Sequence, residues 1–228
     1  MRNFIHSIIS GCIFITLATF FFSCKKDAIP VRPVASLTVT NAIVGSVSFR
    51  VGNIVLPIFI YDYAQLSIIA GESDLYVWPA GDSAHPYFQQ PKFYAENRGV
   101  YSVFLAGQAP NNVTGIVLQD NIPYHTDSTC GVRIINCSPN SQPLNITLST
   151  SPMVNEVSNL TYLQHTDFKL YPAKAANTSY VFQVRNAADN TLLGSIALQT
   201  PRFANVTLVI KGMFGTSSFG IFRVRNDR

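Results

Sequence analysis

Apolar and polar residues alternate over short stretches along most of the chain. In residues 101–107, alternate side chains would point to opposite faces of a strand. One face would carry Tyr101, Val103 and Leu105, and the other Ser102, Phe104 and Ala106. Residues 180–185 and 191–198 alternate in the same way, and residues 186–190 between them predict a turn. The pattern favours strands over helices and predicts half-buried strands in antiparallel sheets.

This pattern occurs twice in the same order. The aligned blocks are residues 37–41 with 132–136 at an offset of 95, 74–80 with 167–173 at 93, 101–107 with 206–212 at 105, and 115–116 with 220–221 at 105. A repeat of roughly 100 residues is too long for a solenoid and has the size of a sandwich domain. We therefore predict two β-sandwich domains, residues 34–125 and 129–228.

The two copies differ between the second and third blocks, where the offset grows from 93 to 105 residues. We expect the second copy to carry an additional hairpin over residues 180–198. The first copy has residues 81–96 in that place, which are richer in proline and aromatic residues and weaker in strand pattern. This asymmetry makes residues 81–96 the best internal indication of a specialised site.

The first 26 residues differ from the rest. An apolar run over residues 4–22 follows Arg2, and the small residue Ser23 directly precedes Cys24, which is typical of an export signal. This end resembles the lipobox of bacterial lipoproteins, and residues 23–27 resemble the leaders of Bacteroidetes-type lipoproteins. The resemblance implies a signal peptide over residues 1–23, diacylation of Cys24, and a short tether over residues 24–33.

An anchored protein of this kind would lie in the cell envelope, at the outer membrane, with its periplasmic or surface-exposed placement left open. The alternative is an uncleaved signal anchor, because residues 4–22 approach the roughly 20 residues of a membrane span. In either case the partner at this end of the chain is a membrane.

Three stretches carry a resemblance to a known family, the domain of unknown function 4397. They are residues 132–140, 74–81 and 101–107, which are similar to its Arg-Val-Asn-Ala-Ser-Pro-like and Tyr-Thr-Val-Phe-Gly-like strands. In the first copy Thr38, Ile43 and Val44 replace the Arg and the Ser-Pro of the opening strand. The resemblance implies an all-β protein of two tandem immunoglobulin-like antiparallel β-sandwich domains after a lipoprotein signal peptide. The family has no established activity, so no catalytic residues come with it.

The net charge and the search for catalytic and metal-binding motifs limit the classes of function that the sequence supports. The 16 basic and 12 acidic residues give a formal charge of +4, which is too small and too scattered to predict nucleic-acid binding. None of His85, His125 and His165 belongs to a metal-ligand pair, and the chain has no nucleophile elbow or phosphate loop. We expect a protein that is not an enzyme and that holds no metal or cofactor.

If the leader directs export, Cys130 and Cys137 would lie in an oxidising compartment, where disulfides can form. Seven residues of strand span about 23 Å, and the odd spacing places the two side chains on opposite faces. A disulfide needs Cα atoms within about 7 Å. Unless the strand is broken between them, we expect two buried thiols, and their spacing does not suit a zinc site.

Residues 78–94 contain the candidate ligand site. Aromatic faces beside amide side chains can hold sugar rings, and the candidate residues are Trp78, Tyr87, Phe88, Phe93 and Tyr94. The alternative is that these aromatics form the core and one edge hairpin. Ser83 and Ser128 each follow an aspartate in a short motif that resembles the O-glycosylation acceptor of exported Bacteroidetes proteins.

These observations favour a membrane-anchored, non-enzymatic module that binds a glycan or a surface protein. A second hypothesis is a structural spacer or assembly subunit of a surface complex, which an exposed edge strand would favour through strand addition. A hydrolase is the least favoured hypothesis, because it would need a polar cleft with perturbed carboxylates.

Overall fold

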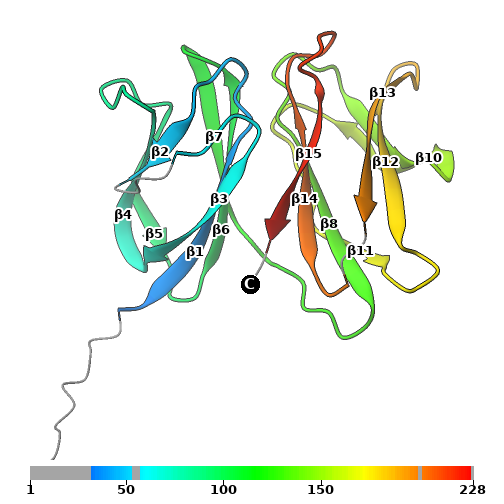
Figure 1. The fold of residues 1–228 in the computed structure, drawn as a ribbon, viewed down its shortest axis with the longest axis horizontal. Coiled ribbons are helices and arrows are strands. Elements are labelled where there is room, and N and C mark those ends of the chain that lie inside the picture. The colour runs from blue at the N-terminus through cyan, green and yellow to red at the C-terminus, as the bar shows by residue number, and fades with distance from the viewer. Residues whose placement is uncertain (1–31, 53–56, 200–201, 227–228) are drawn as a thin grey trace, which may run out of the picture. The chain divides into compact units, whose positions relative to one another are not determined.

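The computed structural model describes residues 32–52, 57–199 and 202–226, and every regular element in these ranges is a β-strand (Figure 1). The proposed signal peptide and Cys24 lie outside the described residues. Within those ranges no helix has the length and hydropathy to cross a membrane. The first seven strands are β1 Val34–Asn41, β2 Phe49–Val51, β3 Tyr63–Ile69, β4 Gly71–Pro79, β5 Phe88–Ala95, β6 Val100–Gln108 and β7 Asn112–Gln119.

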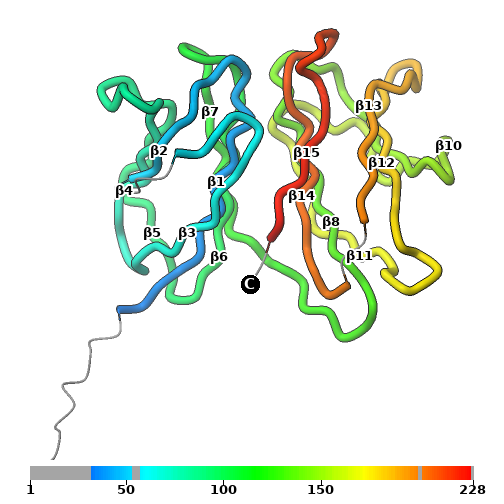
Figure 2. The backbone as a smooth tube through the Cα atoms, viewed as in Figure 1, coloured from blue at the N-terminus to red at the C-terminus, as the bar shows by residue number. Residues whose placement is uncertain are grey.

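The next eight strands form the second half of the fold. They are β8 Thr129–Asn136, β9 Leu144–Leu148, β10 Ser151–Leu160, β11 Lys169–Pro172, β12 Ser179–Asn186, β13 Leu192–Gln199, β14 Asn205–Lys211 and β15 Gly220–Asn226. Between β7 and β8 the chain crosses from one half to the other through residues 120–128, here called the linker (Figure 2).

Strands β1–β7 form the first sandwich and β8–β15 the second, and both are immunoglobulin-like. The sheet orders are β3-β1-β6-β7 and β2-β4-β5 in the first, and β11-β8-β14-β15 and β10-β9-β12-β13 in the second. All strand pairs are antiparallel except β1 with β6 and β8 with β14, which are parallel. The all-β sandwich fold expected from the alternating pattern is therefore present.

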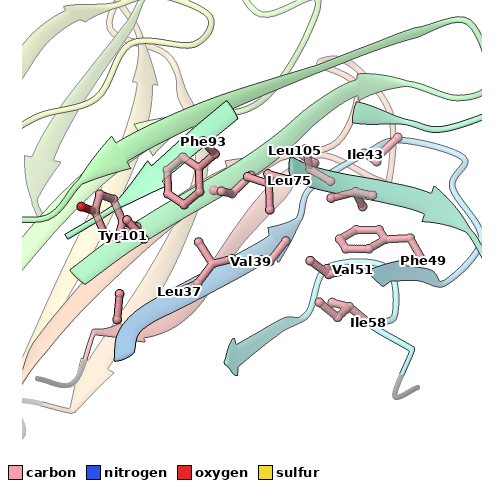
Figure 3. Packing of buried hydrophobic residues seen from close by; sticks show 14 residues of the cluster. Leu37, Val39, Ile43, Phe49, Val51, Ile58, Leu75, Phe93, Tyr101 and Leu105 are labelled. Carbon is pink, nitrogen blue, oxygen red and sulfur yellow. The ribbon is translucent and has the colours of Figure 1, made fainter. Parts of the chain in front are cut away.

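Alternation along each strand supplies the core of the first sandwich. Leu37 and Val39 of β1 and Tyr101 of β6 point between the two sheets, where Figure 3 shows them packed with Phe93 of β5. The rings of Phe93 and Tyr101 meet edge to face, with centroids 5.2 Å apart. The second sandwich has an equivalent core that includes Phe182, which is 1% exposed.

Strand β6 is buried on both faces, so the prediction of a half-buried strand is wrong here. Phe104 and Ala106, on the face opposite Tyr101, are fully buried. They belong to a third apolar cluster, here called the inter-sandwich cluster, made of Ala42, Phe104, Ala106, Ile135, Cys137, Val209 and Val224. Because the cluster draws residues from both halves, the sandwiches pack sheet against sheet, and residues 33–228 form one compact unit.

The duplication extends to the turns. Asn41 and Asn136 end β1 and β8, and each side chain accepts a hydrogen bond from the backbone nitrogen two residues later, at 3.2 and 3.0 Å. Gly107 and Gly212 both have positive φ, and a Cβ atom on either would lie about 2 Å from a backbone oxygen. The same local chemistry therefore closes equivalent turns in both copies.

One predicted repeat block is misaligned. Residues 74–79 of the first block lie in β4, which pairs with β2 and β5. Residues 167–173 instead include β11, which pairs with β8 as β3 pairs with β1. The hairpin over residues 180–198 is therefore the counterpart of β4 and β5 and not an insertion. The strand with no counterpart among the described strands of the first copy is β10. A short alternating strand that ends at a proline can occur in either sheet of a sandwich. Sequence similarity between the two blocks therefore does not show which strand each one pairs with.

Candidate functional site

The five candidate aromatic residues do not form one surface. Phe93 is buried in the first core, and Tyr87 and Phe88 are half-buried and pack against the same core. Trp78 alternates with the buried Val77 and so lies on the outer face of β4, and Tyr94 is 65% exposed on β5. Part of this segment therefore forms core and part lies at the surface.

On the outer face of β4, Trp78 packs beside a residue that sequence reasoning did not select. The rings of Tyr76 and Trp78 are 5.3 Å apart between centroids and tilted by 45°. Gln89 of β5 is the cross-strand partner of Tyr76, and Arg50 of β2 is the partner of Trp78. Arg50, Tyr76, Trp78 and Gln89 are here called the outer aromatic face. The sequence feature that could have identified this pair is the i, i+2 spacing of Tyr76 and Trp78, which places both side chains on one face of a strand.

Arg50 adds a guanidinium group to the outer aromatic face, opposite Trp78. Its Nε atom is buried and has no hydrogen-bond partner among the described residues. Unpaired buried donors are uncommon in proteins because they lose their hydrogen bonds to water without replacement. Together the four residues offer two ring faces, an amide and a guanidinium. Such a set can stack against the C–H face of a sugar ring and donate hydrogen bonds to its hydroxyl groups.

The turn between β4 and β5 folds back over this sheet. The Tyr76 hydroxyl donates a hydrogen bond to the Ser83 carbonyl oxygen. In the same turn His85 Nδ1 lies 2.9 Å from Asp82 Oδ2, and this hydrogen bond lowers the pKa of the Asp82 carboxyl. Ser83 is exposed, whereas Ser128, the second candidate for O-glycosylation, is half-buried in the linker. Only the first of the two serines is freely accessible.

A buried polar network, not anticipated from the sequence, joins the two sandwiches. Arg133 of β8 lies 2.5 Å from Asp120 Oδ1, and the two side chains are 5% and 0% exposed. Arg133 also donates to Thr207 Oγ1 at 3.0 Å and to Ser102 Oγ at 3.3 Å. Its guanidinium carbon lies 4.7 Å from the centroid of the Phe168 ring. The family-like opening strand contains Arg133, but nothing in the sequence identified Asp120 as its partner.

A pocket of about 380 Å³ opens beside this network. Gln119, Asn121, Arg133, His165, Asp167 and Phe168 are among its lining residues. Arg133 is already engaged by Asp120, and His165 Nδ1 donates to the Thr166 carbonyl oxygen at 3.2 Å. Among the described residues, no group of three or more histidine, cysteine or carboxylate side chains is arranged to hold a metal.

Cys130 and Cys137 are buried free thiols, as expected from their spacing. Cys130 belongs to the second core and Cys137 to the inter-sandwich cluster, so their side chains do lie on opposite faces. Burial raises the pKa of both thiols, and most strongly that of Cys137. Neither residue is placed for nucleophilic chemistry.

The histidines make local contacts. His85 pairs with Asp82, and His125 lies between the Thr129 hydroxyl, 2.8 Å from Nδ1, and the Asn205 amide oxygen, 3.0 Å from Nε2. His125 is 9% exposed and fixes the linker against β14.

Comparison with known proteins found no family model that matches this chain and no matching curated protein. The resemblance to the domain of unknown function 4397 therefore stays a prediction, and the functional conclusion depends on the chain's own residues.

Proposed function

We propose that this chain is a lipid-anchored lipoprotein of the cell envelope whose body binds carbohydrate and is not an enzyme. The observation that carries the binding proposal is the pair of adjacent, tilted rings of Tyr76 and Trp78 on the outer sheet of the first sandwich. The lipobox-like sequence that ends at Cys24 supports the anchor. Two bacterial acyl chains would contribute about 0.8 kcal/mol for each buried methylene, which is enough for stable attachment.

A pair of adjacent aromatic rings on a β-sheet suits a sugar better than a protein. Each ring presents a rigid apolar face, while Gln89 and Arg50 supply directed hydrogen bonds at its border. Sheet residues hold such groups at fixed spacing, so little conformational entropy is lost on binding. Binding of a surface protein remains the alternative within the same proposal.

The test of carbohydrate binding uses the full chain in detergent on a broad panel of host and microbial glycans. We expect saturable binding that Trp78→Ala abolishes and that Trp78→Phe partly retains, because phenylalanine keeps a ring face at that position. Tyr94→Ala is the matched control, since Tyr94 is an exposed aromatic of the same sheet outside the Tyr76–Trp78 pair. A panel without any binding would remove carbohydrate from the proposal.

The anchor has a separate test. Cys24→Ala should block lipidation, and globomycin should cause the unprocessed precursor to accumulate. A protein that still matures and stays membrane-bound in the variant would contradict lipidation at Cys24.

A structural spacer or assembly subunit is the second candidate, and one observation favours it. Strand β10 lies at an edge of its sheet, pairs with β9 through several register shifts, and exposes Met153 and Val154. An exposed apolar edge can accept a strand from a partner. If this strand recruits an envelope protein, Val154→Lys should reduce its co-purification, whereas Trp78→Ala should not.

A further inference from the structure

A small pocket lies where the linker meets the start of β14, away from the outer aromatic face. Its volume is about 250 Å³, and it is here called the linker pocket. Its lining includes Pro123, Tyr124, His125, Phe203, Asn205 and Asn226. Asn205 and Asn226 are directly paired across β14 and β15. The pocket therefore belongs to the second sandwich and its linker.

Hydrogen bonds fix the polar groups of this pocket in place. Asn205 Nδ2 donates to the Pro123 carbonyl oxygen at 3.2 Å, and Asn205 Oδ1 accepts from His125 Nε2 at 3.0 Å. Asn226 Oδ1 accepts from the Thr207 hydroxyl at 2.7 Å. The orientation of both amides is thus set by neighbours and not by solvent.

Asn226 retains a donor without a partner. The residue is 2% exposed, and its Nδ2 atom is buried with no hydrogen-bond acceptor in the part of the chain that the structure describes. A preoriented buried donor that lacks an acceptor is destabilising, and a ligand oxygen at this point would remove the deficit. Asn226 is therefore the clearest indication that the linker pocket takes a ligand with an acceptor oxygen.

Two aromatic side chains stand exposed at the linker pocket. Tyr124 is 76% exposed and Phe203 is 58% exposed. Phe203 also adopts the left-handed conformation, with φ of 59°, which is unfavourable for a bulky residue. Its backbone nitrogen donates to the Thr129 carbonyl oxygen at 2.9 Å, which helps to hold this conformation. Backbone strain of this kind is concentrated at ligand-binding sites.

The residues that line the linker pocket indicate which class of ligand would fit it. Apart from His125, the described residues that line the linker pocket are neutral, so they offer a charged ligand no counter-ion. Exposed rings next to fixed amides suit a ligand that has both apolar faces and hydroxyl groups. The volume is below the range of about 300–1,000 Å³ that is typical of drug-sized ligands, so one ring fits better than a chain.

We propose that the linker pocket binds a single neutral sugar ring, with Asn226 donating to a ring substituent and Tyr124 and Phe203 packing against the ring. This inference rests on the proposed carbohydrate-binding function and adds a second site for the same ligand class. The two sites use different residues, so substitutions can separate them.

The experiment uses the full chain in detergent and saturation-transfer NMR with methyl glycosides of common hexoses and N-acetylhexosamines. We expect transfer to at least one glycoside, with affinity about tenfold weaker in Tyr124→Ala because one stacking surface is lost. Phe203→Gly should weaken binding similarly without lowering the melting temperature, since glycine tolerates the positive φ. Asn226→Ala is the third variant, with its fold checked by near-UV circular dichroism.

The outcomes separate the linker pocket from the outer aromatic face. Binding that is lost in Tyr124→Ala and Phe203→Gly but retained in Trp78→Ala supports the pocket. Binding that is lost only in Trp78→Ala overturns the pocket and leaves the proposed function standing. Preferential binding of a nucleoside over every sugar would overturn the sugar assignment, and an absence of sugar binding in the unmodified protein would overturn both proposals.

Discussion

Arg133 and Asp120 form a buried ion pair, with side chains 5% and 0% exposed. Burying two charges carries a desolvation penalty that their attraction offsets only when the remaining donors and acceptors are satisfied. Here Ser102 donates to Asp120 Oδ2 at 2.5 Å, and Thr207 accepts from Arg133. The pair is therefore tolerated because a complete network surrounds it.

Replacing one member of this pair should be far more damaging than replacing both. Arg133→Met leaves the Asp120 carboxylate buried without its counter-ion, and we expect a loss of about 3–5 kcal/mol in the free energy of unfolding. The double variant Arg133→Met with Asp120→Leu should recover most of that loss, since neither charge remains. Urea denaturation measures both effects, with the exposed Asp82→Asn as a control expected to lose much less stability than Arg133→Met. Similar stabilities for the single and double variants would contradict this account.

The reactivity of the Cys130 and Cys137 thiols tests whether both side chains are buried. Because burial raises the pKa of Cys130 and Cys137, almost no thiolate is present at neutral pH, and the sulfur atoms are also inaccessible. We expect a chromogenic disulfide reagent at pH 8 to leave both thiols unmodified in the folded protein and to titrate both in urea. Prompt modification of Cys137 without denaturant would show that the inter-sandwich cluster opens readily.

Glu156 should make stability sensitive to acid. Burial opposes ionisation of this carboxyl, but hydrogen bonds from Lys169 at 2.6 Å and from the Tyr171 hydroxyl outweigh it, so the pKa lies below its ordinary value of 4.5. A lowered folded pKa contributes stability above pH 4.5, and that contribution disappears as the pH falls through the folded value.

Urea denaturation between pH 7 and pH 3 tests this contribution. Glu156→Gln should be less stable than the unmodified protein at pH 7, and the difference should shrink as the pH falls below 4.5. Glu72→Gln, at an exposed position of β4, is the matched control. An equal loss at both ends of the pH range would indicate a packing effect of the glutamine.

At the scale of elements, alternation predicted strands well but not their neighbours. The pattern over residues 101–107 is that of β6, yet it could not show that the face with Phe104 meets another sheet. Residues 74–80 were matched to β11 because short strands share the same pattern whichever sheet they join. Sheet membership depends on contacts between residues far apart in sequence, and those contacts leave no local signal.

The same limit explains what was missed in the candidate sites. Trp78 was selected because it is aromatic, whereas the importance of Tyr76 follows from its place two residues earlier on the same face. Asp120 lies in the linker and meets Arg133 only after both sandwiches have formed. Tyr124, Phe203 and Asn226 come together from three separate segments. No spacing rule links such residues before the topology is known.

At the scale of the whole molecule, residues 33–228 should unfold as one cooperative unit. The inter-sandwich cluster and the Arg133 network give each sandwich a buried face that exists only while the other is folded. Differential scanning calorimetry should therefore record a single transition for the unmodified protein. Phe104→Ala removes a fully buried ring from that cluster, and we expect it to broaden or split the transition. Two transitions in the unmodified protein would show that the sandwiches fold independently.

The parallel pairing of β1 with β6 has a mechanical consequence. β1 is the described strand closest in sequence to the proposed anchor at Cys24, and it runs between β3 and β6 with hydrogen bonds on both sides. A pull from the tether along this strand would load both ladders in shear, so many hydrogen bonds must break together and not one after another. A body held by such a strand can resist drag on a captured ligand without unravelling from its attached end.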